Sequence, residues 1–330
     1  MLPNRVFVGF YHIVSAQAPA HVKHLLECKS PDEFEKDLLY FKEHCYVASH
    51  EELLAHQSEK KSLPRRTAVL TFDDGYRECY EVVRPLLLKY RMPCTFFVCA
   101  NMVDNKSLMF RNKVSLCIDA TDKQSAMERH QSIEKFNERF GLRLRGRDSL
   151  REWLLGLTYR DTKRVGAACE VLGVDTEAYL RGKRPYMTRD EIVQLWRDGF
   201  TIGAHTCNHP ELWLLPWLEA VREIVESCAT VVDITGQEAV PFAIPFNGRT
   251  LSRDKLGDLW ARNKHISLIF DTNNMKKERS FLVNRTDCDQ RYGLTAGGSN
   301  IPQVMRRAYA LEPLRMTKRL LERWVKRSQL

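Results

Sequence analysis

Residues 67–75 have the sequence TAVLTFDDG, and this stretch decides the fold. Residues 67–72 are apolar or β-branched without polar alternation, which is typical of a strand buried on both faces. Two adjacent acids, Asp73 and Asp74, come directly after it. Parallel α/β sheets and barrels place their active sites at this carboxyl end of the strands. The stretch therefore predicts a buried strand followed by a functional site.

Strands and helices alternate on both sides of this stretch, which predicts a parallel α/β sheet. The predicted strands are 5–11, 94–100, 200–204, 240–244, 265–270 and, as the last one, 281–285. The predicted helices are 31–45, a short one from 49, 76–90, 188–199, 214–235 and 252–263. Residues from about 101 to 186 are polar and helix-like, and they are too many for a loop without structure of its own. We expect a helical insertion there, in a position to cover a substrate groove.

Two adjacent carboxylates repel each other unless a cation is near, so one of them could bind a metal while the other stays free as a base. His205 and His209 follow another predicted strand and can converge on one ion, because neutral imidazole suits zinc and related metals. One carboxylate and two imidazoles leave coordination positions open for water and substrate. The alternatives are acids favoured by a helix dipole and histidines that are only hydrogen-bonded.

These motifs, TFDDG at 71–75 and HTxxH at 205–209, resemble the polysaccharide deacetylase (NodB-like) family of carbohydrate esterases. The resemblance implies a distorted (β/α) barrel, a divalent metal that is usually zinc, and removal of an N-acetyl or related acyl group from a sugar. It makes Asp73 the general base, and Asp74, His205 and His209 the metal ligands.

Residues 241–248, PFAIPFNG, are similar to the family's third motif, but Ala243 stands where the family has an arginine that orients the base. Arg285, at the end of a late predicted strand, is our candidate for the missing charge; the alternative is an ordinary surface or core-capping arginine. The resemblance also implies that Tyr76, Pro245 and Phe246 contact the substrate or the oxyanion.

A second departure concerns the proton donor. Many relatives carry a late Leu-x-His whose imidazole protonates the leaving amine, and residues 286–330 contain no histidine. His12 ends the first predicted strand on the same face as Asp73 and is the best substitute, although it could merely shape the pocket. His265 begins a strand and so lies at the wrong end.

The composition bears on where in the cell the protein works and on the redox state of its cysteines. The chain has 330 residues, a net charge of +9 and 10 cysteines with no C-x-x-C spacing, and it has no apolar run of the ~20 residues that a membrane span needs. Its start lacks the features of a secretory signal. We therefore expect a cytoplasmic protein with reduced cysteines.

The predicted domains are a barrel with its insertion over 1–304 and a basic amphipathic helix over 305–330, which carries eight Arg or Lys against two Glu. That helix either packs on the barrel or touches an anionic membrane, at the inner membrane face; nucleic acid is not expected as a partner. The expected substrate is a nucleotide-linked or lipid-linked N-acyl sugar used in cell-surface polysaccharide or glycolipid synthesis. The rival functions are a non-catalytic saccharide-binding protein and a formamido-sugar deformylase.

Overall fold

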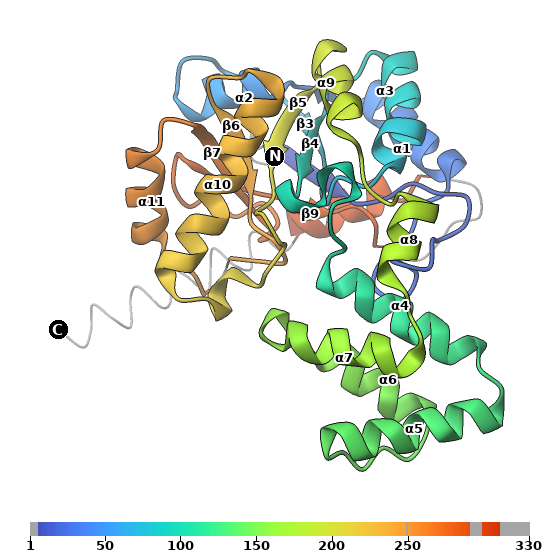
Figure 1. Ribbon diagram of the computed structural model, residues 1–330. Helices are drawn as coiled ribbons and strands as arrows, with labels where there is room; N and C mark the ends of the chain where they lie inside the picture. Colours follow the sequence, from blue (N-terminus) through green and yellow to red (C-terminus); the bar gives the residue numbers. More distant parts are fainter. Residues whose placement is uncertain (1–5, 249, 291–298, 311–330) are drawn as a thin grey trace, which may run out of the picture.

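The computed structural model describes residues 6–248, 250–290 and 299–310. Figure 1 shows a barrel of strands surrounded by helices, with a second group of helices extending from it. Within these ranges, no helix is both long enough and apolar enough to pass through a membrane.

The strands form one parallel sheet in the order β8-β7-β6-β5-β4-β3-β1-β9, and β2 pairs with the first two residues of β3. The strands are β1 (Phe7–Tyr11), β2 (Tyr46–Val47), β3 (Thr67–Phe72), β4 (Thr95–Val98), β5 (Thr201–Ala204), β6 (Val240–Ala243), β7 (Ile266–Asp271), β8 (Leu282–Asn284) and β9 (Thr286–Asp287). Because parallel neighbours align their carboxyl ends, the segments that follow β1, β3, β5 and β6 come together at one mouth of the sheet.

The sheet curls into a nearly closed barrel, as the family resemblance implies. Its two outermost strands, β8 and β9, are separated in the chain by Arg285 alone, so the edges of the sheet must return to each other at that residue. Side chains from six strands fill the interior as one buried cluster, which includes Val8, Phe97 and Phe270. Gly203 of β5 makes room for this filling, because a Cβ there would lie 2.5 Å from the ring of Phe97.

Helices cover the outside of the barrel, and several begin where the sequence places a capping box. Ser30, Ser49 and Thr188 each accept a hydrogen bond from the glutamate three residues on, whose side chain bonds back. The helices of the barrel are α1 (Pro31–His44), α2 (His50–Gln57), α3 (Arg84–Tyr90), α9 (Arg189–Arg197), α10 (Trp217–Thr235) and α11 (Arg253–Arg262).

The predicted insertion between β4 and α9 is helical and has a hydrophobic core of its own. Its helices are α4 (Phe110–Lys123), α5 (Ala126–Phe140), α6 (Arg147–Gly156), α7 (Thr162–Leu172) and α8 (Thr176–Lys183), after a 3₁₀ helix over Ala100–Asn105. Phe136, Leu154 and Val165 are among the buried side chains that hold α4 to α7 together. In Figure 1 this group extends away from the barrel, and α4 and α8 lie where the two parts meet.

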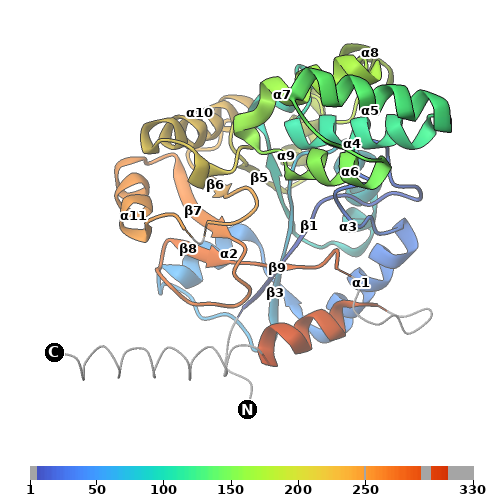
Figure 2. The ribbon, with the colours of Figure 1, turned by 90° about the horizontal axis from the view of Figure 1, so that it is seen from below.

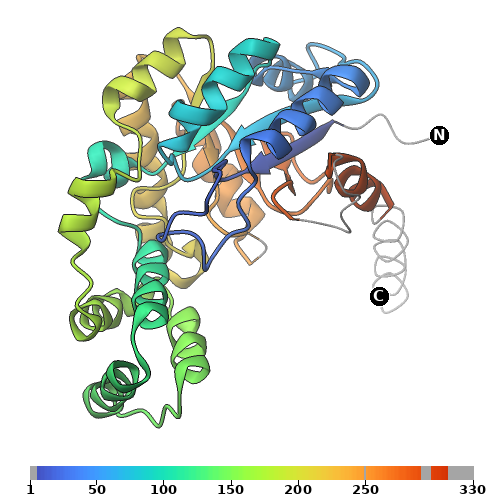
Figure 3. The same cartoon turned by 90° about the vertical axis from the view of Figure 1, so that its right-hand side faces the viewer.

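Residues 301–310 form a helix that packs on the main core through Ile301, Val304, Met305 and Ala308. Figures 2 and 3 show it in red on the side of the barrel where β9 lies. The helix begins before the predicted boundary at 305, and its described part is packed on the protein. Residues 311–330 lie outside the described part, so membrane contact by them stays a prediction.

Three sequence predictions need correction. The helix predicted for 76–90 is a π-helical turn, Cys79–Val83, followed by α3, because Pro85 has no N–H to donate and Tyr76 is extended in a bridge to Tyr186. The helix predicted from 214 begins at Trp217, after Pro216. The strand at 281–285 is not the last one, because β9 follows it and pairs with β1.

Candidate active site

The two acids that follow β3 lie on a tight turn. Asp73 continues the strand, and its N–H donates to the Tyr11 carbonyl at 2.9 Å. Asp74 and Gly75 then both have positive φ, 72° and 71°. At Gly75 a Cβ would also lie 3.1 Å from Val98, so glycine suits the position on both counts. The turn gives the neighbouring carboxylates different partners.

Asp73 is held by Arg285 in a buried two-point ion pair. Arg285 Nη1 lies 2.6 Å from Asp73 Oδ1, and Nη2 lies 2.8 Å from Oδ2. The contact expected from the sequence is therefore present. Burial acts to raise the pKa of Asp73, but the charge and hydrogen bonds of Arg285 outweigh it and lower that pKa below its ordinary value.

The position of Arg285 also accounts for Ala243. The guanidinium lies over the rings of Phe10, Phe97 and Phe270, at 4.8, 5.1 and 5.9 Å from their centroids. Ala243 belongs to the same interior cluster as Phe97 and Phe270. Its small side chain leaves the barrel interior to an arginine that arrives from the seam between β8 and β9.

Asp74, His205 and His209 come together, each offering one ligand atom within 4.8 Å of the others. Asp74 Oδ1 lies 3.6 Å from His205 Nε2 and 3.2 Å from His209 Nε2, and all three residues are buried. His209 itself has φ 56° and precedes Pro210, and its N–H donates to Thr206 Oγ1 at 2.9 Å. The sequence expectation that the pair sits on a turn is confirmed.

The three residues fit a divalent cation such as zinc. His205 Nδ1 lies 2.8 Å from the Ala243 carbonyl, which favours a proton on Nδ1 and leaves Nε2 facing Asp74. Burial lowers the pKa of His205 to about 4, so the imidazole is neutral at pH 7, as a ligand must be. Within the described residues, buried Asp74 Oδ1 and His209 Nδ1 have no hydrogen-bond partner. A cation would satisfy the carboxylate oxygen.

His12 is paired with a residue that sequence reasoning missed. Its Nδ1 lies 2.7 Å from Asp289 Oδ2, which also accepts the His12 backbone N–H at 3.0 Å. Burial acts to lower the pKa of His12, but the hydrogen bond and charge of Asp289 raise it to about 10. Burial raises the pKa of Asp289 to about 6. At pH 7 the pair is therefore an imidazolium and a carboxylate, and His12 has a proton to donate.

Three residues were expected at the substrate, and they differ in burial: Tyr76 and Pro245 are buried and Phe246 is half-buried. Tyr76 is buried and stacked on Tyr186, and its hydroxyl accepts from Asn112 at 3.0 Å, so its phenol lies beneath the mouth. Pro245 is buried just after β6. Phe246 has φ 58°, and its half-buried ring lies 4.8 Å from the ring of His209.

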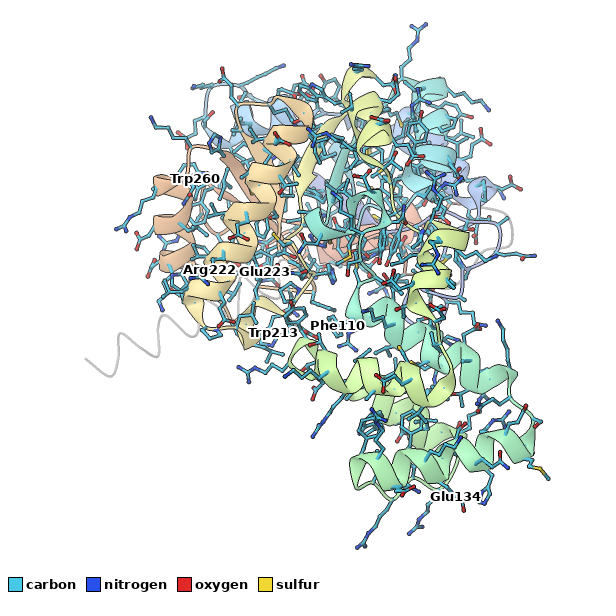
Figure 4. All side chains as sticks on the ribbon, viewed as in Figure 1. Phe110, Glu134, Trp213, Arg222, Glu223 and Trp260 are labelled. Carbon is cyan, nitrogen blue, oxygen red and sulfur yellow. The ribbon has the colours of Figure 1, made fainter. Side chains whose placement is uncertain are left out.

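The insertion reaches this mouth through aromatic rings. Phe110 of α4 and Trp213 lie 6.5 and 6.1 Å from Phe246, ring centroid to centroid. Figure 4 labels both at the junction between barrel and insertion. Buried Glu211 fastens the junction by accepting from Arg111 Nη2 at 3.1 Å and from the Tyr159 N–H at 2.9 Å.

Glu223 of α10, also labelled in Figure 4, fixes the loop between the two histidines. Its Oε2 accepts the N–H groups of Cys207 and Asn208, both at 2.9 Å. Because two adjacent amides share one carboxylate oxygen, the loop between His205 and His209 has a defined path.

Several solved structures share this fold. A Streptococcus pyogenes deacetylase, PplD, solved in complex with acetate, superposes with a TM-score of 0.55 at 18% identity, over 86% of this chain and 92% of that one. IcaB from Ammonifex degensii gives 0.53 at 17%, over 86% and 91%. A de-N-acetylase from Aggregatibacter actinomycetemcomitans gives 0.53 at 16%, over 85% and 94%. At these identities the likeness establishes the fold alone.

No curated protein matches the sequence significantly. The sequence model of the family described as polysaccharide deacetylase matches residues 60–132 and 158–256, which together make up more than half of the chain. The match includes Asp73, Asp74, His205 and His209 and leaves His12 and Arg285 outside. By this match and this fold, the chain belongs to the polysaccharide deacetylase family.

Proposed function

We propose that the protein is a metal-dependent hydrolase that removes an N-acetyl or related N-acyl group from a sugar. One observation carries the proposal: a carboxylate held by an arginine, Asp73, lies beside a separate group of one carboxylate and two imidazoles, with His205 Nε2 only 3.9 Å from Asp73 Oδ2. This arrangement would provide a base next to a metal site that does not use it as a ligand.

A divalent cation bound by Asp74, His205 and His209, most simply zinc, would polarise the amide carbonyl and promote ionisation of water. Asp73 removes the proton of the attacking water, whose oxygen forms the new bond to the acyl carbon. Arg285 keeps this carboxylate ionised and oriented. The backbone N–H near Phe246 stabilises the negative oxygen of the tetrahedral intermediate.

His12 completes the reaction as the proton donor. As the bond between the acyl carbon and the nitrogen breaks, His12 donates its proton to the amine nitrogen, and the products are a carboxylic acid and a free amino sugar. Asp289 is the positioning residue, because it holds Nδ1 and leaves Nε2 for the transfer.

The substrate that we propose is an N-acyl sugar linked to a nucleotide or a lipid, which the protein meets in the cytoplasm or at the inner membrane face. Family membership supports a saccharide, and the basic charge of residues 305–330 supports a surface-bound substrate. Free N-acyl sugars, which carry neither a nucleotide nor a lipid, serve as the comparison.

The test is to incubate purified protein and zinc with nucleotide-linked, lipid-linked and free N-acetyl and N-formyl sugars, and to measure the acid and the amine released. We expect acetate and an equal amount of amino sugar from an N-acetyl sugar. Formate alone would identify a deformylase. Zinc binding without release of either acid would overturn the proposal and leave the non-catalytic alternative.

A further inference from the structure

A run of six apolar residues, Trp-Leu-Leu-Pro-Trp-Leu at 213–218, reaches the surface beside the mouth of the barrel. It joins a 3₁₀ helix, Leu212–Leu214, to the first turn of α10. None of the six is buried; four are half-buried, Pro216 is exposed, and Leu218 is exposed to 74%. Consecutive apolar residues that reach the surface of a soluble protein generally mark an interaction site. We call residues 213–218 the apolar segment.

The packing of α10 does not account for the exposure of Leu218. Ala220, Ile224 and Cys228 follow one another at intervals of four residues and face the main core. A step of two residues turns an α-helix by about 200°, so Leu218 points away from this buried stripe. The fold itself therefore gives no reason for a leucine at this position.

Exposed basic side chains from three elements border the apolar segment. Arg160, from the insertion, donates to the Leu214 carbonyl. Lys255 of α11 lies 5.6 Å from the ring centroid of Trp217. Arg222 is exposed on α10, one turn after the segment ends. The apolar side chains are thus surrounded by positive charge.

The acids in the same chain segments do not cancel this charge. Asp161 follows Arg160, but it is paired with Arg164. Glu219, directly after the segment, is the exposed acid of the first turn of α10. Tryptophan and leucine beside a basic border are typical of surfaces that enter a bilayer interface, because indole rings lie at the level of the headgroups and cations contact anionic lipids.

The apolar segment extends to the catalytic mouth. The ring of Trp213 lies 6.1 Å from that of Phe246, which in turn lies 4.8 Å from the ring of His209. Figure 4 labels Trp213 at the junction between barrel and insertion, and Arg222 farther along α10. A lipid surface in contact with Leu218 would therefore lie beside the mouth.

We propose that the apolar segment enters the interface of an anionic lipid bilayer and holds the mouth of the barrel at its surface. That this contact presents a lipid-linked sugar to the catalytic centre rests on the proposed function; the contact itself does not. It also differs from attraction of the basic residues at 305–330, because salt screens exposed charges but does not weaken the burial of apolar side chains.

The test measures binding of the full chain to vesicles of phosphatidylcholine and phosphatidylglycerol by sedimentation, at low and at high salt. We expect binding to persist in part at high salt, and Leu218→Asp to weaken this remaining binding about tenfold or more. Vesicles with brominated acyl chains, which quench tryptophans that enter the bilayer, give a second measurement. Quenching should occur in the unchanged protein and decrease in Trp217→Phe.

The matched control is Met127→Asp, because Met127 is 73% exposed on α5, at the end of the insertion that lies far from the barrel in Figure 1. It should bind vesicles like the unchanged protein. If Leu218→Asp binds as well as Met127→Asp at high salt, or if Trp217→Phe leaves the quenching unchanged, the apolar segment does not enter the bilayer.

Two further measurements separate the alternatives. Sedimentation velocity without vesicles detects a dimer, and a dimer that Leu218→Asp dissociates would make the apolar segment an interface between two copies and overturn the lipid contact. Acid release from a free N-acetyl sugar is measured on the same proteins. If it is absent while Leu218 still controls vesicle binding, the proposed reaction fails and the lipid contact stands.

Discussion

Asp73 and Arg285 lie 212 residues apart in the chain and meet in a fully buried pair. Two charges taken out of water are stable together only when both ends of the contact are hydrogen-bonded, and the removal of one partner leaves an uncompensated charge. The planar guanidinium can bond both oxygens of a carboxylate, whereas an ammonium cannot. The pair therefore sets the orientation of the base as well as its charge.

Arg285→Lys should consequently lower kcat strongly, by on the order of 100-fold, because Asp73 loses its two-point contact. Arg285→Leu should also destabilise the protein by about 3–5 kcal/mol, since it leaves a buried carboxylate unpaired. Steady-state kinetics and urea unfolding measure the two effects. Arg84→Lys is the control, at a partly exposed pair with Asp198, and should cost less than about 1 kcal/mol. Equal effects at both arginines would contradict this role of Arg285.

The pairing of His12 with Asp289 predicts how activity depends on pH. His12 can donate its proton only below its pKa of about 10, so kcat should fall as the pH rises through that value. In Asp289→Asn the hydrogen bond and the charge that contribute most to raising this pKa are gone, and burial then lowers the pKa against only the smaller contributions of Asp74 and Asp73. The fall should then occur several pH units lower, with the larger loss at pH 8 than at pH 6.

A pH profile of kcat for the two proteins checks this. His265→Asn serves as the control, because His265 is exposed at the start of β7 and bonds the Glu238 carbonyl. It should leave the profile unchanged. An Asp289→Asn profile that is lower at every pH but not displaced would mean that Asp289 only supports the fold.

Sequence reasoning found the residues of this site whose signal is local. Asp73 and Asp74 follow an apolar strand, and His205 and His209 share one short motif, so neighbours in the chain revealed them. Asp289 carries no such signal. It reaches His12 only because β9, a strand of two residues, pairs with β1, and so short a strand has no readable alternation.

At the level of elements, boundaries were predictable where a side chain caps the start of a helix and unpredictable where a proline lies in the predicted helix. The capping boxes at Ser30, Ser49 and Thr188 gave starts that the structure confirms. Pro216 moved the start of one predicted helix to Trp217, and the turn before Pro85 is π-helical, because periodicity of apolar residues continues through a proline while backbone hydrogen bonding does not.

The insertion is joined to the catalytic loop by Glu211, which lies two residues after His209. Glu211→Gln should weaken the bonds to Arg111 and to the Tyr159 N–H, because it removes the negative charge. We expect amide exchange around residues 157–161 to become several-fold faster and KM for a sugar substrate to rise. Hydrogen exchange and kinetics measure these effects.

Glu170→Gln is the matched control, since Glu170 makes an exposed ion pair with Arg139 inside the insertion. It should alter neither exchange near Tyr159 nor KM. If Glu211→Gln also leaves both unchanged, the insertion does not depend on this contact for its position at the mouth.

The whole molecule concentrates its excess positive charge at the C-terminal end of the chain. Residues 305–330 carry eight Arg or Lys against two Glu, and each basic residue near an anionic surface contributes about 1 kcal/mol. Removal of residues from 312 onward should therefore reduce binding to vesicles that contain anionic phospholipid, and should leave acid release from a free N-acyl sugar unchanged. Sedimentation with vesicles at low and high salt measures this. Unchanged binding after truncation would contradict the proposed contact between these residues and the membrane.

The central claim is that Asp74, His205 and His209 hold a cation while Asp73 stays free of it. Metal content per chain, measured by mass spectrometry after zinc loading and dialysis, tests this most directly when Asp73→Asn and Asp74→Asn are compared with the unchanged protein. We predict close to one zinc per chain in the unchanged protein and in Asp73→Asn, which should lack activity, and strongly reduced zinc in Asp74→Asn. Loss of zinc from Asp73→Asn with retention in Asp74→Asn would exchange the roles of the two acids, and equal zinc in all three would contradict the site itself.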